Sequence, residues 1–147
     1  MLNAAAMAQH RYQLQILERH LDTFGHVNNA TYLELFEEAR WDWLTQNGYG
    51  LARVQSERKG PTILEIKISF KRELRNRQPI AILSWMESYP SRVGTAVQQM
   101  FDETGQLCCE AHFVIGLFDL ELRRLIAPTL AWQQALGLPP DFTSDAE

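Results

Sequence analysis

The sequence of 147 residues is poor in cysteine, has no long apolar run and carries no excess of basic residues. Its two cysteines, Cys108 and Cys109, are adjacent, and neighbours on a strand point to opposite faces, so we expect no disulfide between them. Residues 1–9 lack the basic and apolar regions of a signal peptide, and no stretch is long and apolar enough to cross a bilayer. These absences predict a cytoplasmic protein that does not enter a membrane.

Other absences exclude whole classes of function. The formal net charge of -4 argues against a nucleic-acid partner, because such proteins present a basic surface. Histidine and cysteine residues do not occur at the spacings that bind zinc, so we expect no metal site. There is also no glycine-rich phosphate loop and no Gly-x-Ser-x-Gly motif. Catalysis, if present, should therefore use ordinary side chains without a cofactor.

What remains is a chain suited to one domain with a substantial core. Hydrophobic residues make up 46% of the sequence, which is typical of a globular protein. We expect a flexible tail over residues 1–10, one domain over residues 11–138 and a polar tail over residues 139–147. The length leaves little room for a second domain.

The hydrophobic pattern predicts one long helix followed by several strands. Residues 30–46 show helical periodicity, with Asn28 or Asn29 as the cap and Gly48 as the stop. Strands are expected over residues 12–17, 64–71, 80–89, 94–102 and 106–118, and a short helix over residues 130–136. This order predicts an α+β fold, in which a five-stranded antiparallel sheet wraps around the long central helix. Exposed sheet edges favour a homodimer or homotetramer.

Asp22 stands a few residues before the amino end of the long helix, and Gly25 lies between them. Helix amino ends carry unpaired amides and partial positive charge, which can polarise a carbonyl oxygen. A carboxylate beside such an end provides both aids that thioester cleavage requires, a nucleophile or base and a donor for the oxyanion. An aspartate in this position is otherwise a common turn residue, so both interpretations stay open on these grounds alone.

The spacing Asp22-x-x-Gly25, followed by Tyr32-Leu33 and Phe36-Glu37-x-Ala39-Arg40, resembles the 4-hydroxybenzoyl-CoA thioesterase family of hotdog proteins. The resemblance implies the hotdog fold and hydrolysis of acyl-CoA to a free acid and coenzyme A, with Asp22 as nucleophile or general base. It also implies that the helix amino end, near Asn28 and Asn29, polarises the thioester carbonyl. His20 takes the place of the first aspartate of the family's Asp-x-Asp-x-x-Gly motif.

Other residues are assigned roles beside Asp22. His26 resembles a histidine that is considered functional in the acyl-carrier-protein thioesterases, so His26 and Asn29 join Asp22 as catalytic candidates. A basic cluster after the second predicted strand is suited to the phosphates of coenzyme A. The candidates for substrate binding are Gly25, Asn28, Tyr32, Glu37, Lys71, Arg72 and Arg75.

Two alternatives to acyl-CoA hydrolysis remain open. The Asn28-Asn29 pair is similar to that of the acyl-carrier-protein branch, so the donor of the acyl group could be a carrier protein. The substitution of His20 for an aspartate also leaves open a hotdog protein that binds acyl-CoA without catalysis. Rates on matched coenzyme A and carrier-protein thioesters distinguish these hypotheses.

Overall fold

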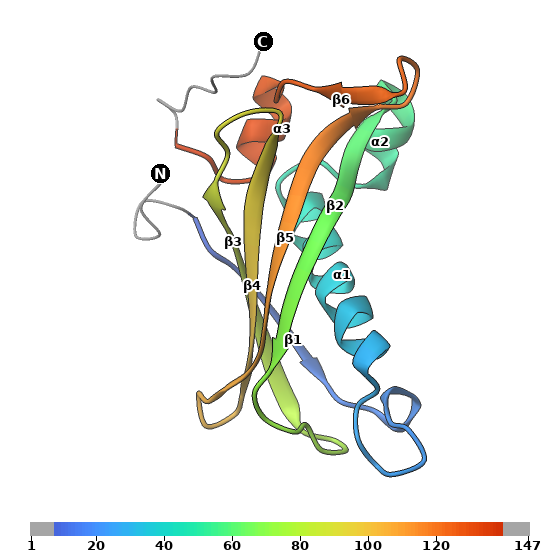
Figure 1. Ribbon diagram of the computed structural model, residues 1–147, viewed down its shortest axis with the longest axis vertical. Helices are drawn as coiled ribbons and strands as arrows, with labels where there is room; N and C mark the ends of the chain where they lie inside the picture. Colours follow the sequence, from blue (N-terminus) through green and yellow to red (C-terminus); the bar gives the residue numbers. More distant parts are fainter. Residues whose placement is uncertain (1–7, 140–147) are drawn as a thin grey trace.

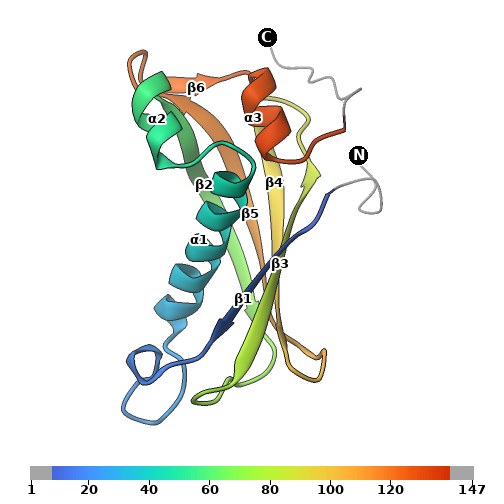
Figure 2. The ribbon, with the colours of Figure 1, turned by 180° about the vertical axis from the view of Figure 1, so that it is seen from behind.

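The computed structural model describes residues 8–139, which form a single antiparallel sheet with a long helix along one face (Figures 1 and 2). The main strands occur in the order β1-β3-β4-β5-β2, and β6 pairs with β5. Their bounds are β1 His10–Gln15, β2 Lys59–Phe70, β3 Pro79–Ser88, β4 Val93–Asp102, β5 Leu107–Asp119 and β6 Arg124–Ile126. The predicted hotdog-type α+β fold is confirmed, with six strands rather than five.

Helix α1, Asn29–Gln46, runs along the sheet and packs one of its faces into the core. Asn28 caps it through a hydrogen bond from the Ala30 amide to Asn28 Oδ1 (2.9 Å), and Gly48 follows its end with a φ of +85°. Burying large apolar side chains stabilises the fold by about 1.5–3 kcal/mol each. The predicted apolar stripe of α1 is buried: Tyr32, Leu35, Phe36, Ala39 and Trp43.

The two edges of the sheet differ. On β1, the Tyr12 hydroxyl donates to Glu38 (2.6 Å) and His10 bonds to Asp42 (2.8 Å), so α1 side chains cover this edge. On the opposite edge, β2 pairs only with β5 among the described strands. Leu64, Ile66 and Phe70 of β2 are large, apolar and exposed, which is unusual for an unpaired edge strand.

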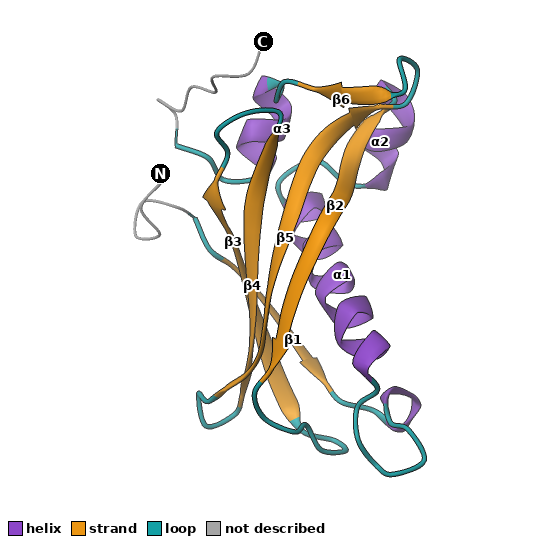
Figure 3. Cartoon of the chain, in the orientation of Figure 1, coloured by secondary structure: helices purple, strands orange, loops and turns teal. Residues whose placement is uncertain are grey.

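Two short helices close the end of the sheet where α1 terminates (Figure 3). Helix α2, Leu51–Glu57, follows α1 directly, and helix α3, Leu130–Ala135, is the last described element of regular structure. Asn47 Nδ2 donates to the Ala135 carbonyl (2.7 Å), and Trp132 Nε1 donates to the Tyr89 hydroxyl (3.0 Å). These contacts join α3 to α1 and to the end of β3.

At the opposite end of the molecule lie three connections, which join β1 to α1, β2 to β3 and β4 to β5 (Figure 1). The first of these contains Asp22, and the second contains the predicted basic cluster. No helix within residues 8–139 is long and apolar enough to span a membrane. The predicted tails, residues 1–10 and 139–147, lie mostly outside the described residues, and His10 is the first residue of β1.

Candidate active site

The half-buried Asp22 organises the loop before α1 through its own side chain. Its Oδ1 accepts hydrogen bonds from the amides of Phe24 (2.8 Å) and His26 (3.1 Å). The Asp22 amide donates to the His26 carbonyl (2.7 Å), and Gly25 completes the turn with a φ of +80°. Both side-chain bonds fall on Oδ1, so Oδ2 accepts none from residues 8–139.

The amino end of α1 follows this loop at once, and most of its first amides have acceptors. The Asn28 amide donates to the His20 carbonyl (3.3 Å) and the Ala30 amide to Asn28 Oδ1, while Thr31 bonds to the Asn28 carbonyl (2.9 Å). The Asn29 amide has no acceptor among the described residues. It is therefore the group at this helix end that is suited to polarise a carbonyl oxygen.

A cleft of about 430 Å³ lies beside the amino end of α1. Its walls come from the α1 entry and from the end of β2 with the turn after it: His26, Val27, Asn29, Tyr32, Phe70, Lys71, Arg72 and Glu73. The amides of Lys71 (2.8 Å) and Arg72 (3.0 Å) both donate to the Cys108 carbonyl, which fixes the backbone of this wall. The cleft therefore combines a free helix amide with two cationic side chains.

The apolar side of the cleft is formed by two aromatic rings. Tyr32 of α1 and Phe70 of β2 meet edge to face, with their centroids 5.1 Å apart. Burial raises the pKa of Tyr32 to about 12, so its hydroxyl stays protonated at neutral pH. Phe70 is half exposed, so its ring can contact a ligand.

The sequence also matches a protein-family model over most of its length. Residues 16–144 match the model of the thioesterase-like superfamily. The chain belongs to that superfamily. The predictions of a thioester hydrolase and of a hotdog-fold relative of the 4-hydroxybenzoyl-CoA thioesterases are thereby confirmed.

Individual thioesterases resemble the chain over most of its length. It is 28% identical over 116 residues to the long-chain acyl-CoA thioesterase FadM of Escherichia coli, covering 78% of this chain and 87% of FadM. The structure of YbaW, a probable thioesterase from Escherichia coli, superposes with a TM-score of 0.76 at 27% identity, covering 86% and 96% of the two chains. A Staphylococcus aureus protein in complex with CoA shares the fold with a TM-score of 0.82 at 14% identity, covering 98% and 94%.

The thioesterase structure brings most of the predicted site residues together. His26, Asn29, Tyr32, Lys71 and Arg72 all line the cleft. Asn28 caps the adjoining helix, and Asp22 and Gly25 lie in the loop that leads into it, but none of these three residues lines the cleft. A Cβ at Gly25 would meet no atom within 4 Å, so its positive φ, rather than a close backbone approach, explains the glycine.

Two more predicted residues lie outside the cleft and away from the Asp22 loop. Glu37 is exposed farther along α1, and Arg40, three residues later, donates from Nη1 to Gln98 Oε1 (3.0 Å) beneath the helix. The Arg40 guanidinium also lies 4.3 Å from the ring centroid of Phe113. Arg75 is exposed in the turn before β3, and its amide donates to Gln78 Oε1 (2.8 Å). These two assignments gain no support from the geometry of the cleft.

The structure adds residues that sequence reasoning missed. Glu73 forms an ion pair with His26 Nε2 across the mouth of the cleft, and Phe70 forms its apolar wall. Phe70 is the last of the apolar residues that alternate along β2 with Leu64, Ile66 and Ile68, so a signal for it existed. Glu73 lies in an irregular turn, where periodicity gives no information about partners.

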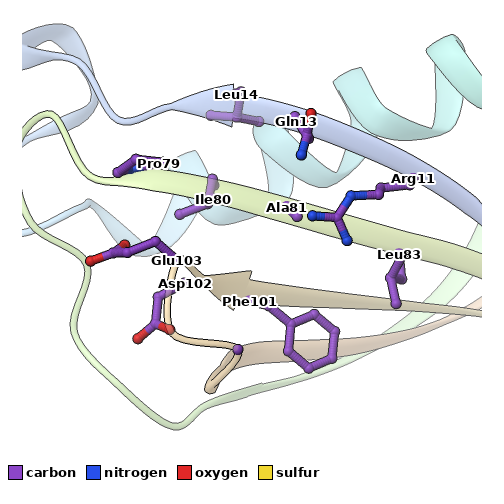
Figure 4. A pocket seen from close by; sticks show the side chains of 11 residues that line it. Arg11, Gln13, Leu14, Pro79, Ile80, Ala81, Leu83, Phe101, Asp102 and Glu103 are labelled. Carbon is purple, nitrogen blue, oxygen red and sulfur yellow. The ribbon is translucent and has the colours of Figure 1, made fainter.

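A larger cavity, of about 690 Å³, lies against β1, β3 and the β4–β5 turn (Figure 4). Its walls include Arg11, Phe101, Asp102 and Glu103, but none of the predicted site residues. Within residues 8–139, no group of three or more histidine, cysteine, aspartate or glutamate residues is arranged to hold a metal ion. Of these two cavities, the cleft at α1 is therefore the one that adjoins the family motif.

Proposed function

We propose that the protein hydrolyses acyl-CoA thioesters to a free acid and coenzyme A, with Asp22 as the reactive carboxylate. The observation that carries this proposal is the loop over residues 22–29, which has the Asp22 carboxylate at one end and the unused Asn29 amide at the other. The cleft beside it has room for a thioester and carries positive charge from Lys71 and Arg72. The relationship to FadM supports long-chain acyl groups as substrates.

Asp22 can act in two ways from this position. As a nucleophile, a carboxylate oxygen attacks the thioester carbon and expels the thiolate of coenzyme A, and water then hydrolyses the resulting anhydride. As a general base, it takes a proton from a water molecule that attacks the same carbon. The Asn29 amide stabilises the oxyanion in both routes, and the leaving thiolate takes up a proton. Binding of Oδ1 within the turn supports Oδ2 as the reacting atom.

The cationic wall is assigned to the phosphates of coenzyme A. Lys71 and Arg72 follow β2 directly and line the cleft, whereas Arg75, three residues farther along the same turn, lies outside it. Charge-assisted hydrogen bonds from such side chains bind phosphate oxygens more strongly than neutral donors do. The side chain of His26, which pairs with Glu73 and lines the cleft, is assigned to contact the substrate between the phosphates and Asn29. No step of the proposed reaction requires a cofactor.

The acyl group and a second subunit are assigned to the open side of the sheet. Leu64, Ile66 and Phe70 leave an apolar strip exposed along the unpaired edge of β2, and Phe70 is shared with the cleft. Pairing of two β2 edges covers this strip in a homodimer, and further association gives a homotetramer. The acyl chain lies between the subunits in this arrangement.

Cys108 and Cys109 are free thiols, the state that the cytoplasm maintains.

Release of free thiol from a series of acyl-CoA thioesters tests the proposal. The series runs from short to long chains and includes aromatic acyl groups, and the same acyl groups on a carrier protein form a second arm. We expect turnover of the coenzyme A thioesters, fastest for long chains. Absence of turnover with every coenzyme A thioester overturns the proposal, and exclusive turnover of carrier-protein thioesters reassigns the donor.

A further inference from the structure

His20 occupies a buried position just before the Asp22 loop. Its Nδ1 accepts a hydrogen bond from the Leu17 amide (2.9 Å), and its own amide donates to the Leu17 carbonyl (2.9 Å). These two bonds close the short 3-10 turn Glu18–His20 that leads from β1 into the loop. The imidazole therefore fixes the entering stem of the loop.

The same residue also holds the leaving stem. Its carbonyl accepts the hydrogen bond from the Asn28 amide (3.3 Å), and Asn28 is the residue that caps α1. Next to this hydrogen bond, Leu21 and Val27 form an antiparallel bridge between the two stems. The two stems of the loop that contains Asp22 thus meet at His20, and the Asn29 amide follows immediately.

We propose that His20 is a positioning residue, whose neutral imidazole holds the Asp22 loop and the amino end of α1 in the arrangement that the reaction requires. The inference rests on the proposed function, because it assigns a role within the same site. His20 does not line the cleft and contacts no reacting atom. It acts through the backbone of the loop.

The bond to Leu17 determines the protonation state that His20 needs. A backbone amide only donates, so Nδ1 must keep its lone pair, and a proton on Nδ1 removes this bond. The charged groups around the ring are Arg19 beside it and Glu34 and Glu38 on α1, which form a small cavity with His20. Burial, followed by the positive charge of Arg19, lowers the pKa of His20 and outweighs the two carboxylates. The imidazole is therefore neutral at neutral pH and is protonated only on acidification.

Three variants test the inference on acyl-CoA turnover. His20→Leu removes the acceptor, and we expect kcat to fall about tenfold while KM changes less than twofold. His20→Asn restores an acceptor near Nδ1 that does not titrate, so kcat should recover to within about threefold at pH 7 and resist acidification more than the parent. The matched control is His112→Asn, which makes the same substitution at a histidine of β5 and should behave as the parent does.

Amide exchange measured by NMR gives a readout that does not depend on turnover. At pH 7, we expect the amides of Leu17 and Asn28 to exchange at least tenfold faster in His20→Leu than in the parent. In the parent, we expect the same increase when the pH is lowered well below the pKa of His20. Both comparisons are corrected for intrinsic exchange rates. If His20→Leu keeps parental kcat and parental exchange, the inference is overturned while the proposed function stands. If the parent turns over no acyl-CoA, the proposed function fails, and exchange at Leu17 and Asn28 alone decides whether His20 holds the loop.

Discussion

Two turns of this chain share one design, the turn before α1 and the turn between β4 and β5. In the first, Asp22 Oδ1 accepts amides two and four residues later, at 2.8 and 3.1 Å, and Gly25 has a φ of +80°. In the second, Asp102 Oδ1 accepts the amides of Thr104 and Gln106, at 2.9 and 3.0 Å, and Gly105 has a φ of +85°. The backbone amide of each aspartate also donates to the carbonyl of the residue four positions later, His26 or Gln106.

The likeness shows that an Asp-x-x-Gly sequence needs no catalytic role to explain it. Each aspartate satisfies amides in its own turn, and each glycine supplies the left-handed backbone. The turns differ in what adjoins them, since Asp22 leads into a helix amino end beside Lys71 and Arg72, whereas Asp102 leads into a strand beside Glu103. The proposed reactivity of Asp22 therefore comes from its surroundings and not from its turn.

The largest expected difference is in catalysis. Asp22→Asn keeps an acceptor for both turn amides but removes the charge, so kcat/KM for acyl-CoA should fall about 10³-fold. Asp102→Asn makes the same change in the matching turn and should leave kcat/KM within about twofold of the parent. Thiol release and thermal unfolding of both variants check the comparison.

An equal loss of activity in the two variants would contradict the assignment, because it would trace the effect to the turn itself. Parental activity in Asp22→Asn would contradict it more directly, since no charge at this position would then be required. Unfolding temperatures close to the parent value show that neither variant loses activity by unfolding.

Much of the fold could be predicted because hydrophobic periodicity and helix-capping residues, both visible in the sequence, determine where its main elements lie. Helix α1 begins and ends within one residue of the expected bounds, since Asn28, Gly48 and the buried stripe are all local signals. Helix α2 was missed because its cap, Gly50, has no side chain to bond the first turn, and its last residue is followed by Arg58 at a φ of 58°. Strand β6 has three residues and exists by pairing with β5, which no local pattern reveals.

The candidate site was predictable where it is local and not where it depends on distant contacts. The Asp22 turn and the helix cap lie within eight residues, and the resemblance to the family covers them. The contacts of His26 with Glu73 and of Tyr32 with Phe70 join residues that lie 47 and 38 positions apart, so sequence spacing does not fix them. Arg75 appeared equivalent to Lys71 and Arg72 in sequence, but only the backbone of the turn decides which cations face the cleft.

The charges beside the two turns give the second test. Lys71→Gln removes a cation from the cleft, and we expect KM for acyl-CoA to rise about three- to tenfold with little change in kcat. Glu103→Gln removes a charge beside the matching turn and should leave KM unchanged. Raising the salt concentration should increase the parental KM and narrow its difference from Lys71→Gln, because salt screens exposed charges.

Substitution of the two glycines tests the left-handed backbone conformation that the turns share. Gly25→Ala and Gly105→Ala each force an L-residue into a left-handed backbone, so each should lower the free energy of unfolding by about 1 kcal/mol. Neither added Cβ meets an atom within 4 Å, so steric contact adds nothing to this cost. Urea denaturation measures the losses, which should be similar. Activity at a temperature where both variants are folded should fall only for Gly25→Ala.

The smallest expected effect concerns a hydrogen bond within the second turn that the first turn lacks. Thr104 Oγ1 donates to Asp102 Oδ1 (2.6 Å), whereas the corresponding residue in the first turn is Phe24, which has no such donor. The Thr104 hydroxyl, followed by the Gln106 amide, holds the pKa of Asp102 below its ordinary value. Because the pKa is lowered in the folded state, this stabilisation is present above the ordinary aspartate pKa and is lost as the pH falls through the lower one.

Thr104→Val keeps the carboxylate and removes its strongest donor, so this variant should be less stable than the parent at pH 7. The difference should shrink as the pH falls below about 4, where protonation of Asp102 removes the charge-assisted bond from the parent as well. Urea denaturation at pH 7 and at pH 3 measures both differences. A difference of equal size at the two pH values would mean that the hydroxyl stabilises the turn without its partner's charge, and the two turns would then be more alike than their side chains indicate.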